Sequence, residues 1–126
     1  MLTNALTPAF EYVSEVCKAV DSKDEQQLAR FLTEECTFVY ANSDPVIGRD
    51  NILAQSKNFM ALIADIKHQL VEVWAIDDVI VSRLNVTYTR KDGSTLTVPA
   101  ATIWRMRNKQ IHEYRIYIDV AQLFAH

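Results

Sequence analysis

The sequence predicts one α+β domain, spanning residues 1–126, in which helices come first and a mainly antiparallel sheet comes last. The chain has 126 residues, and 49% of them are hydrophobic, which is enough for one compact core of ordinary domain size. Near Ile66 the spacing of the apolar residues changes from the helical period of 3.6 to the strand period of 2. Three short turn sequences divide the region that follows, namely Asp77-Asp78, Asp92-Gly93 and Asn108-Lys109.

The first half of the chain has the pattern of three helices and one short strand. Thr7-Pro8 is typical of a helix N-cap followed by the first helical residue. Ser22-Lys23-Asp24-Glu25 has the form of a capping box and predicts a short second helix. Residues 36–40 are β-prone. After the turn at Gly48-Arg49-Asp50, a wide apolar stripe predicts a third helix that runs to about Ala64.

The second half predicts a four-stranded antiparallel meander. If each turn is a two-residue loop, counting outward from it gives the register, because side chains alternate strictly between the two faces. Counting sets Glu72 opposite Arg83, Arg83 opposite Thr102, and Thr102 opposite Arg115. It collects a row of polar residues on one face, with Trp74 at the end of the row. The row consists of His68, Glu72, Arg83, Asn85, Thr87, Thr102, Arg115, Tyr117 and Asp119.

The opposite face of the predicted sheet is too apolar to meet water. Three helices in a chain of this length can cover only one face. We expect the polar row to line a pocket under the helices, because small residues such as Ala100 and Thr102 leave room for a ligand. The apolar row would then meet a second subunit, so the sequence predicts a homodimer whose pocket accepts a small apolar molecule with a polar group. The apolar row consists of Leu84, Val86, Tyr88, Pro99, Ala101, Ile103, Tyr114, Ile116 and Ile118.

Composition and spacing argue against several classes of function. The formal net charge is −3 and there is no basic cluster, so a nucleic-acid partner is not expected. No stretch approaches the ~20 apolar residues of a membrane span, and Met1 to Phe10 lacks the basic start of a targeting segment, so no membrane partner is expected either. Cys17 and Cys36 suggest neither a disulfide framework nor a metal site, which favours a cytoplasmic setting. No phosphate loop or metal-ligand pair is found, and no cofactor is expected.

Three short motifs carry a resemblance to a known family. Tyr40-Ala41-Asn42 precedes the Gly48-Arg49-Asp50 turn, Arg83-Leu84-Asn85 lies on a central strand, and Tyr117-Ile118-Asp119 closes the last strand. Three helices, a short strand, the Gly48-Arg49-Asp50 turn into the third helix and a curved antiparallel sheet that ends in Tyr117-Ile118-Asp119 resemble the nuclear transport factor 2-like superfamily, in particular its SnoaL-like branch, over roughly Phe10 to Phe124. The resemblance implies a cone in which three N-terminal helices pack on a curved sheet. This fold hosts isomerases, cyclases, dehydratases, epoxide hydrolases and non-catalytic binders.

Locally, the motifs are similar to those of limonene-epoxide hydrolase. That resemblance implies that Tyr40, Asn42 and Asp119 hold a water molecule, that Asp119 takes its proton as general base, and that Arg83 steadies the charge. Asn85 stands where that family has the aspartic acid that protonates the epoxide oxygen. An amide cannot supply a proton, and losing a positioned general acid costs typically ~10²–10⁴-fold in rate.

The sequence therefore supports three functional hypotheses. The first is a cofactor-free lyase, isomerase or cyclase in which Asp119 moves a proton, Asn85 and Tyr40 polarise an oxygen, and Arg83 tunes Asp119. The second is a domain that binds a small hydrophobic ligand without chemistry, and the third is a weakened epoxide hydrolase. Structural roles stay open beside these: Asp119 also fits a cap of a terminal turn, and Arg83 also fits a structural ion pair with Glu72.

Overall fold

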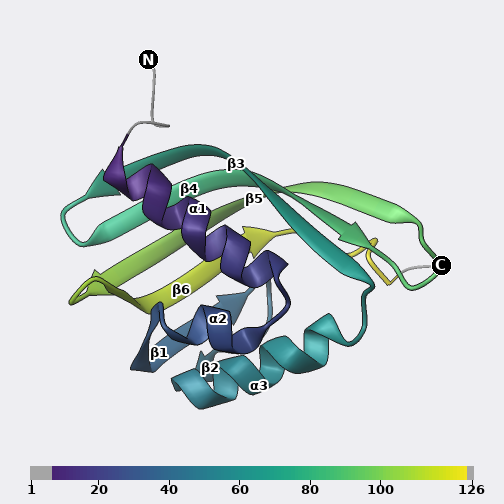
Figure 1. Ribbon diagram of the computed structural model, residues 1–126, viewed down its shortest axis with the longest axis horizontal. Coiled ribbons are helices and arrows are strands. Elements are labelled where there is room, and N and C mark those ends of the chain that lie inside the picture. Colours follow the sequence, from purple (N-terminus) through teal and green to yellow (C-terminus); the bar gives the residue numbers. More distant parts are fainter. Residues whose placement is uncertain (1–6, 125–126) are drawn as a thin grey trace.

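The computed structural model describes residues 7–124 and arranges them as helices packed on one side of a curved sheet (Figure 1). The first six residues of the segment from Met1 to Phe10, in which the sequence shows no targeting signal, lie outside the described part. Within residues 7–124, no helix is both long enough and apolar enough to cross a membrane. The elements in chain order are α1 (Pro8–Asp21), α2 (Glu25–Ala29), β1 (Leu32–Tyr40), β2 (Val46–Ile47), α3 (Arg49–Met60), β3 (Asp65–Ile76), β4 (Val79–Thr89), β5 (Thr95–Arg107) and β6 (Gln110–Ile118).

The sheet has the strand order β2-β1-β6-β5-β4-β3. The neighbouring strands β3 to β6 form the expected antiparallel meander, and β1 joins β6 in parallel. Figure 1 shows α1 lying across the sheet, with α2 and α3 below α1 in this view and α3 packed near β1 and β2. The predicted α+β class, with three helices on a mainly antiparallel sheet, is therefore confirmed. The short strand β2 was not predicted.

The N-cap predictions for the first two helices differ in outcome. The hydroxyl of Thr7 accepts a hydrogen bond from the backbone N–H of Phe10 at 3.1 Å, so α1 begins as expected. The second helix is capped by Asp24, whose carboxylate accepts from the N–H of Gln26 at 3.0 Å. Ser22 is not the cap, because its backbone is still right-handed helical and it closes the end of α1. The third helix ends at Met60, earlier than predicted.

Two of the three turns close as two-residue loops. Asp77-Asp78 joins Ile76 and Val79, and Asn108-Lys109 joins β5 and β6. Asn108 and Lys109 have φ values of 51° and 67°, the positive values that a tight hairpin turn of the type I′ class requires at both positions. The expected pairing of Glu72 with Arg83 is confirmed.

The turn at Asp92-Gly93 is longer than predicted, and this changes the register of the sheet. The last pair of the β4–β5 ladder is Thr89 with Thr95, and the N–H of Arg90 bonds to the carbonyl of Ser94 at 2.7 Å, which leaves residues 91–93 as the loop. Gly93 has φ +90°, and its N–H bonds to the carbonyl of Arg90 at 2.9 Å, which fits a three-residue hairpin loop with glycine at the left-handed position. One extra residue shifts the count by one, so Ala101 and not Thr102 lies opposite Arg83.

Two irregularities in the ladders add further shifts of one residue. Between Leu70 and Glu72 the strand β3 contains an extra residue, Val71, so that Leu70 pairs with Leu84 and His68 with Val86. A second irregularity between Arg105 and Met106 places Ile116 opposite Thr102 where counting predicts Arg115. Each shift of one residue exchanges the two faces of the strand beyond it.

The resulting sheet has a face toward the helices, which we call the inner face, and an outer face. Alternation along β4 is strict, with Leu84 and Val86 buried on the inner face and Arg83 on the outer face. The expectation that the polar row would face the helices is therefore wrong for most of its members. Of the predicted apolar row, Leu84, Val86, Tyr88, Tyr114, Ile116 and Ile118 lie on the inner face, and Pro99, Ala101 and Ile103 lie on the outer face.

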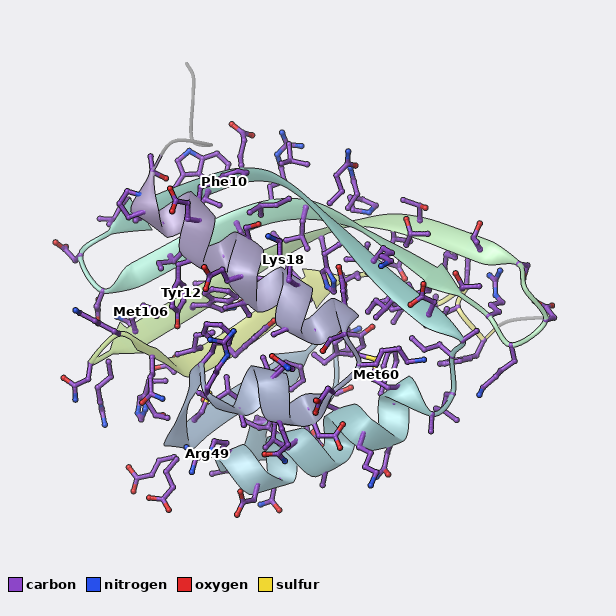
Figure 2. All side chains as sticks on the ribbon, viewed as in Figure 1. Phe10, Tyr12, Lys18, Arg49, Met60 and Met106 are labelled. Atoms are coloured by element: carbon purple, nitrogen blue, oxygen red, sulfur yellow. The ribbon has the colours of Figure 1, made fainter. Side chains whose placement is uncertain are left out.

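Aromatic side chains fill much of the layer between α1 and the sheet. Tyr12, labelled in Figure 2, projects from α1 and meets the ring of Trp104 edge-on at a centroid distance of 6.2 Å. Trp104 in turn lies 5.3 Å from Tyr114 on β6. These contacts attach α1 to the middle of the sheet.

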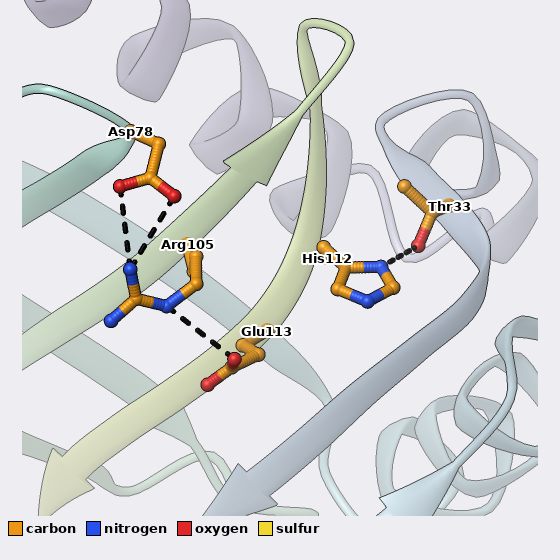
Figure 3. Close-up of polar contacts among 5 residues, drawn as sticks. All are labelled: Thr33, Asp78, Arg105, His112 and Glu113. Atoms are coloured by element: carbon orange, nitrogen blue, oxygen red, sulfur yellow. Dashed lines mark hydrogen bonds and ion pairs between the residues drawn. The ribbon is translucent and has the colours of Figure 1, made fainter.

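Polar contacts connect the strands near the β5–β6 hairpin (Figure 3). Arg105 reaches Asp78 at 3.3 Å and Glu113 at 3.5 Å, which links the β3–β4 turn to β6. Nδ1 of His112 lies 2.9 Å from the hydroxyl of Thr33, which links β6 to its parallel neighbour β1. Asp78 and Arg105 are exposed, and the other three side chains are half-buried.

Candidate functional site

An apolar cavity of about 110 Å³ lies between the helices and the inner face of the sheet. All three helices and the strands β1, β3, β4, β5 and β6 contribute side chains to its wall. Most of these are aliphatic or aromatic. A volume near this value is comparable with that of a dry engineered cavity that binds benzene. The few polar groups in the wall therefore decide what chemistry the cavity can support.

His68 on β3 and Asp21 at the end of α1 form a buried pair at this wall. Nδ1 of His68 lies 2.5 Å from Oδ1 of Asp21, and the backbone N–H of His68 donates to Oδ2 at 3.1 Å. The side chains are only 12% and 17% exposed. Because a carboxylate can only accept, Nδ1 of the neutral imidazole carries the hydrogen, and Nε2 keeps a free lone pair. The pair thus has the form of a base held in one tautomer by a carboxylate.

A second polar group in the wall is a pair of tyrosines. The hydroxyls of Tyr40 on β1 and Tyr88 on β4 lie 2.9 Å apart, and the ring of Phe59 on α3 contacts both. Burial raises the pKa of both hydroxyls above the ordinary value. They therefore stay protonated at neutral pH. One hydroxyl donates to the other, which leaves one O–H available to a ligand oxygen.

A third polar group lies on the inner face of β4 and β5. The hydroxyls of Ser82 and Thr102 are hydrogen-bonded to each other, and the residues are 1% and 5% exposed. Two residues further along β5, the indole N–H of the buried Trp104 has no hydrogen-bond partner within the described part of the chain. An unsatisfied buried donor costs about 1–3 kcal/mol. The groups Ser82, Thr102 and Trp104 all contribute to the cavity wall.

Three of the residues predicted for the site do line the cavity, namely Tyr40, His68 and Thr102. Both His68 and Thr102 lie on the face opposite Arg83, because Val71 and the longer β4–β5 loop each shift the register by one residue. The polar row of the sequence prediction is therefore divided between the two faces of the sheet.

Asp119 and Asn42, both expected at the reacting centre, lie outside the cavity lining. Asp119 follows the end of β6, is exposed, and its Oδ1 accepts a hydrogen bond from the N–H of Ala121 at 3.0 Å. This is the capping role that the sequence left open. Asn42 is exposed in the turn after β1. The three residues expected to hold a water molecule, Tyr40, Asn42 and Asp119, are therefore not gathered around the cavity.

The other predicted site residues lie outside the cavity lining, because the register places them on the outer face. Arg83 forms an ion pair with Glu72 at 2.7 Å, and Asn85 donates to Oε1 of Gln69 at 3.3 Å. The remaining members of this group are Thr87, whose hydroxyl meets that of Thr97 at 2.8 Å, and Trp74, Arg115 and Tyr117, which are exposed.

Sequence reasoning missed Asp21, although a signal for it exists. Val13, Cys17 and Asp21 are spaced four residues apart on α1, so they lie in one row of the helix. The first two line the cavity. A carboxylate that continues an apolar row of a helix is a candidate for a buried partner. Cys17 itself is no candidate nucleophile, because burial, with the nearby Asp21 carboxylate, raises the pKa of its thiol to about 12.

A metal site is not evident in the described residues. Within residues 7–124, no three side chains of the His, Cys, Asp and Glu types are grouped as they would be around a metal ion. The polar groups of the cavity are instead an imidazole and hydroxyls, together with Gln55 and Ser56 of α3.

Comparison with solved structures finds the same fold in proteins of low sequence identity. A protein with a ketosteroid isomerase-like fold from Catenulispora acidiphila DSM 44928, solved with trimethylamine, has a TM-score of 0.84 at 21% identity over 94% of this chain and 92% of that chain. A protein described as a SnoaL-like polyketide cyclase, from Jannaschia sp. CCS1, has a TM-score of 0.79 at 15% identity over 93% and 92% of the two chains. An LEH-like epoxide hydrolase from M. tuberculosis has a TM-score of 0.78 at 11% identity over 92% and 86%. At these identities the likeness shows the fold alone.

The chain thus has the α+β fold of solved proteins that are described as ketosteroid isomerase-like and NTF2-like. Residues 13–114 match the model of the SnoaL-like domain, and the chain belongs to that family. No curated protein matches the chain. Because this fold hosts unrelated reactions, function has to be argued from the groups in the cavity.

Proposed function

We propose that this chain is a cofactor-independent enzyme of the lyase, isomerase or cyclase type that moves a proton on a small, largely apolar molecule carrying a polar oxygen. His68 is the catalytic base, and Asp21 is its positioning residue. The observation that carries the proposal is the imidazole in the wall of an apolar cavity with its Nδ1 held by a buried carboxylate at 2.5 Å. In this proposal His68 takes the role that the sequence motifs suggested for Asp119.

The reaction that this geometry supports is removal of a proton from a carbon next to a carbonyl group. Nε2 of His68 accepts the proton, and Asp21 stabilises the imidazolium that forms. The negative charge develops on the carbonyl oxygen, where the free O–H of the Tyr40–Tyr88 pair can donate to it. Reprotonation at another atom gives isomerisation, and loss of a neighbouring group gives elimination.

Hydrogen–deuterium exchange into a simple probe tests this proposal. Acetophenone combines an apolar ring, one carbonyl oxygen and an exchangeable methyl group, and NMR in D2O follows the loss of its methyl signal. We expect exchange with the unaltered protein and a loss of about 10²–10⁴-fold in His68→Gln. Asp21→Asn should lower the rate, because the neutral amide no longer supplies the negative charge that stabilises the imidazolium.

His112→Gln is the matched control, because His112 is partly exposed and bonds to Thr33 away from the cavity. It should exchange the probe at the unaltered rate. Unchanged exchange in His68→Gln, or its abolition by Asp119→Asn instead, would overturn the assignment of the base. Binding of acetophenone without any exchange would favour the second hypothesis, a domain that binds a ligand without chemistry, which the largely apolar cavity wall also supports.

We also propose that the chain forms a homodimer through the outer face of the sheet. Trp74, Ile103 and Tyr117 are exposed there by 44%, 38% and 53%, and the nearby Glu72 and Arg83 offer charges of both signs. Such a face can be complementary to a second copy of itself around a two-fold axis. Sedimentation equilibrium should show a dimer that Ile103→Arg dissociates and that Ile47→Arg, on the distant β2, leaves intact. A monomeric unaltered protein would contradict the proposal.

A further inference from the structure

The buried hydroxyl pair on β4 and β5 is not used by the proposed proton transfer. Ser82 and Thr102 are direct cross-strand partners, both face the cavity, and both are almost fully buried. In a hydrogen-bonded pair of hydroxyls, one donates and the other accepts. The accepting hydroxyl therefore retains its own hydrogen. Burying such a donor in an apolar wall is unfavourable unless another acceptor reaches it.

Trp104 provides an independent observation at the same part of the wall. It follows Thr102 by two residues on β5, so the two side chains lie on the same face. The residue is 2% exposed, and its indole N–H has no hydrogen-bond partner within residues 7–124. Two donors without a matching acceptor thus lie close together on the wall of one cavity. An acceptor oxygen of a ligand would satisfy both donors.

These donors are separated from the tyrosine pair across the sheet. Tyr40 on β1 pairs with Ile116 on β6, and Ile116 pairs with Thr102 on β5, so Tyr40 and Thr102 lie in one cross-strand row. At a spacing of about 4.8 Å between neighbouring strands, their Cα atoms are roughly 10 Å apart. The wall therefore offers two hydroxyl pairs, with the aliphatic side chain of Ile116 in the row between them.

We infer that Ser82, Thr102 and Trp104 form a second oxygen-binding subsite, and that the ligand is an apolar molecule with two carbonyl oxygens. One oxygen meets the Tyr40–Tyr88 pair, and the other meets this subsite. The inference deepens the proposed function and rests on it for the role of the first oxygen. Acceptors are favoured over hydroxyl donors because each pair has a hydrogen to offer and the indole nitrogen can only donate.

Binding of a matched pair of probes tests the subsite. 1,4-Diacetylbenzene carries two carbonyl oxygens, and acetophenone lacks one of them. The chain has two tryptophans, so Trp74→Phe on the outer face leaves Trp104 as the only tryptophan, whose fluorescence can be excited selectively. In this background we expect the diketone to bind about tenfold more tightly than the monoketone. The indole N–H resonance of Trp104 should move with the diketone and much less with the monoketone.

Ser82→Ala combined with Thr102→Val removes both hydroxyls and keeps the shape of the wall. The diketone preference should then fall to about twofold or less, while Thr102→Ser should retain it. Thr87→Ser combined with Thr97→Val alters the hydroxyl pair on the outer face and should leave the preference intact. An unaltered preference in the inner-face double variant, or none in the Trp74→Phe protein, would overturn the inference.

The binding experiment tests the subsite independently of the proton-transfer role of His68. His68→Gln lacks the base but keeps both sets of donors, so it should still prefer the diketone. If His68→Gln exchanges acetophenone at the unaltered rate while the diketone preference persists, the proton-transfer role fails and the subsite stands. If exchange depends on His68 while the preference is absent, the subsite fails and the proton-transfer role stands.

Discussion

The two faces of β4 place neighbouring residues in opposite surroundings. On the outer face, Arg83 pairs with Glu72 while the two side chains are 56% and 42% exposed. On the inner face, polar groups are few and largely buried, and most are paired, as Ser82 is with Thr102, whereas the indole N–H of Trp104 has no partner within residues 7–124. The outer face therefore carries more charged residues, whereas the polar side chains of the inner face are fewer and more deeply buried. A site of chemistry is therefore better recognised by the burial of a polar pair than by the number of polar residues in a row.

The largest expected difference between the faces concerns packing. Leu84 is 3% exposed and lies on the inner face among the apolar residues that border the cavity. Leu84→Ala should lower the free energy of unfolding by about 2–5 kcal/mol, because it removes buried contacts and leaves a void. Urea denaturation measures the change. A loss below about 1 kcal/mol would show that this part of the inner face can collapse around the missing atoms.

The thiols of Cys17 and Cys36 should make the stability of the protein depend on pH. Burial raises the pKa of the Cys17 thiol from 9.0 to about 12. The folded state therefore holds this proton more tightly than the unfolded state. The resulting stability is fully present below pH 9 and is lost as the pH rises toward 12.

The free energy of unfolding should accordingly decrease above pH 9, by at most roughly 1.4 kcal/mol per pH unit for this group. Cys36, whose pKa is also raised to about 12 by burial, adds a slope of the same sign. Urea denaturation between pH 7 and pH 11 measures the slope. Cys17→Ala should make it shallower, and an equal slope in that variant would contradict the burial of the thiol.

The smallest effect is expected on the outer face. Arg83→Ala removes an exposed ion pair with Glu72 and should cost only about 0.2–1 kcal/mol, with less effect in high salt. Urea denaturation at two salt concentrations tests this. This value applies to the separated protomer; in the proposed dimer, where a second copy covers this face, the loss should be larger and should depend on protein concentration. A loss well above 1 kcal/mol at a protein concentration that dissociates the dimer would contradict the prediction.

The sequence allows the class of the fold to be predicted because periodicity and turn residues are local signals. Asn108-Lys109 has the residues and the length of a tight turn, and the structure confirms it. Asp92-Gly93 has an equally clear turn signal, but the glycine serves a longer loop. Loop length decides the register, and the dipeptide alone does not specify it. The extra residue Val71 has no local signal at all, since a valine is typical of any strand.

The site was less predictable because its parts come from different elements. His68 and Asp21 are 47 positions apart in the chain, and only the packing of α1 on β3 brings them together. His68 and Thr102 were expected in the pocket and do line it, although the face on which they were grouped with Arg83 was the wrong one. Tyr88, which was assigned only to the apolar row, is also a hydrogen-bond partner of Tyr40.

The unpaired Val71 also bears on how this strand can change length during evolution. His68 and Glu72 are four positions apart, yet they project to opposite sides of the sheet, because one residue between them has no cross-strand partner. A relative that lost this codon would keep the pairing on either side and would still present its imidazole to the cavity. Loss of one residue between Ser82 and Tyr88 would instead move the side chains of half of β4 to the opposite face of the sheet. Gaps are thus tolerable in one strand and disruptive in its neighbour.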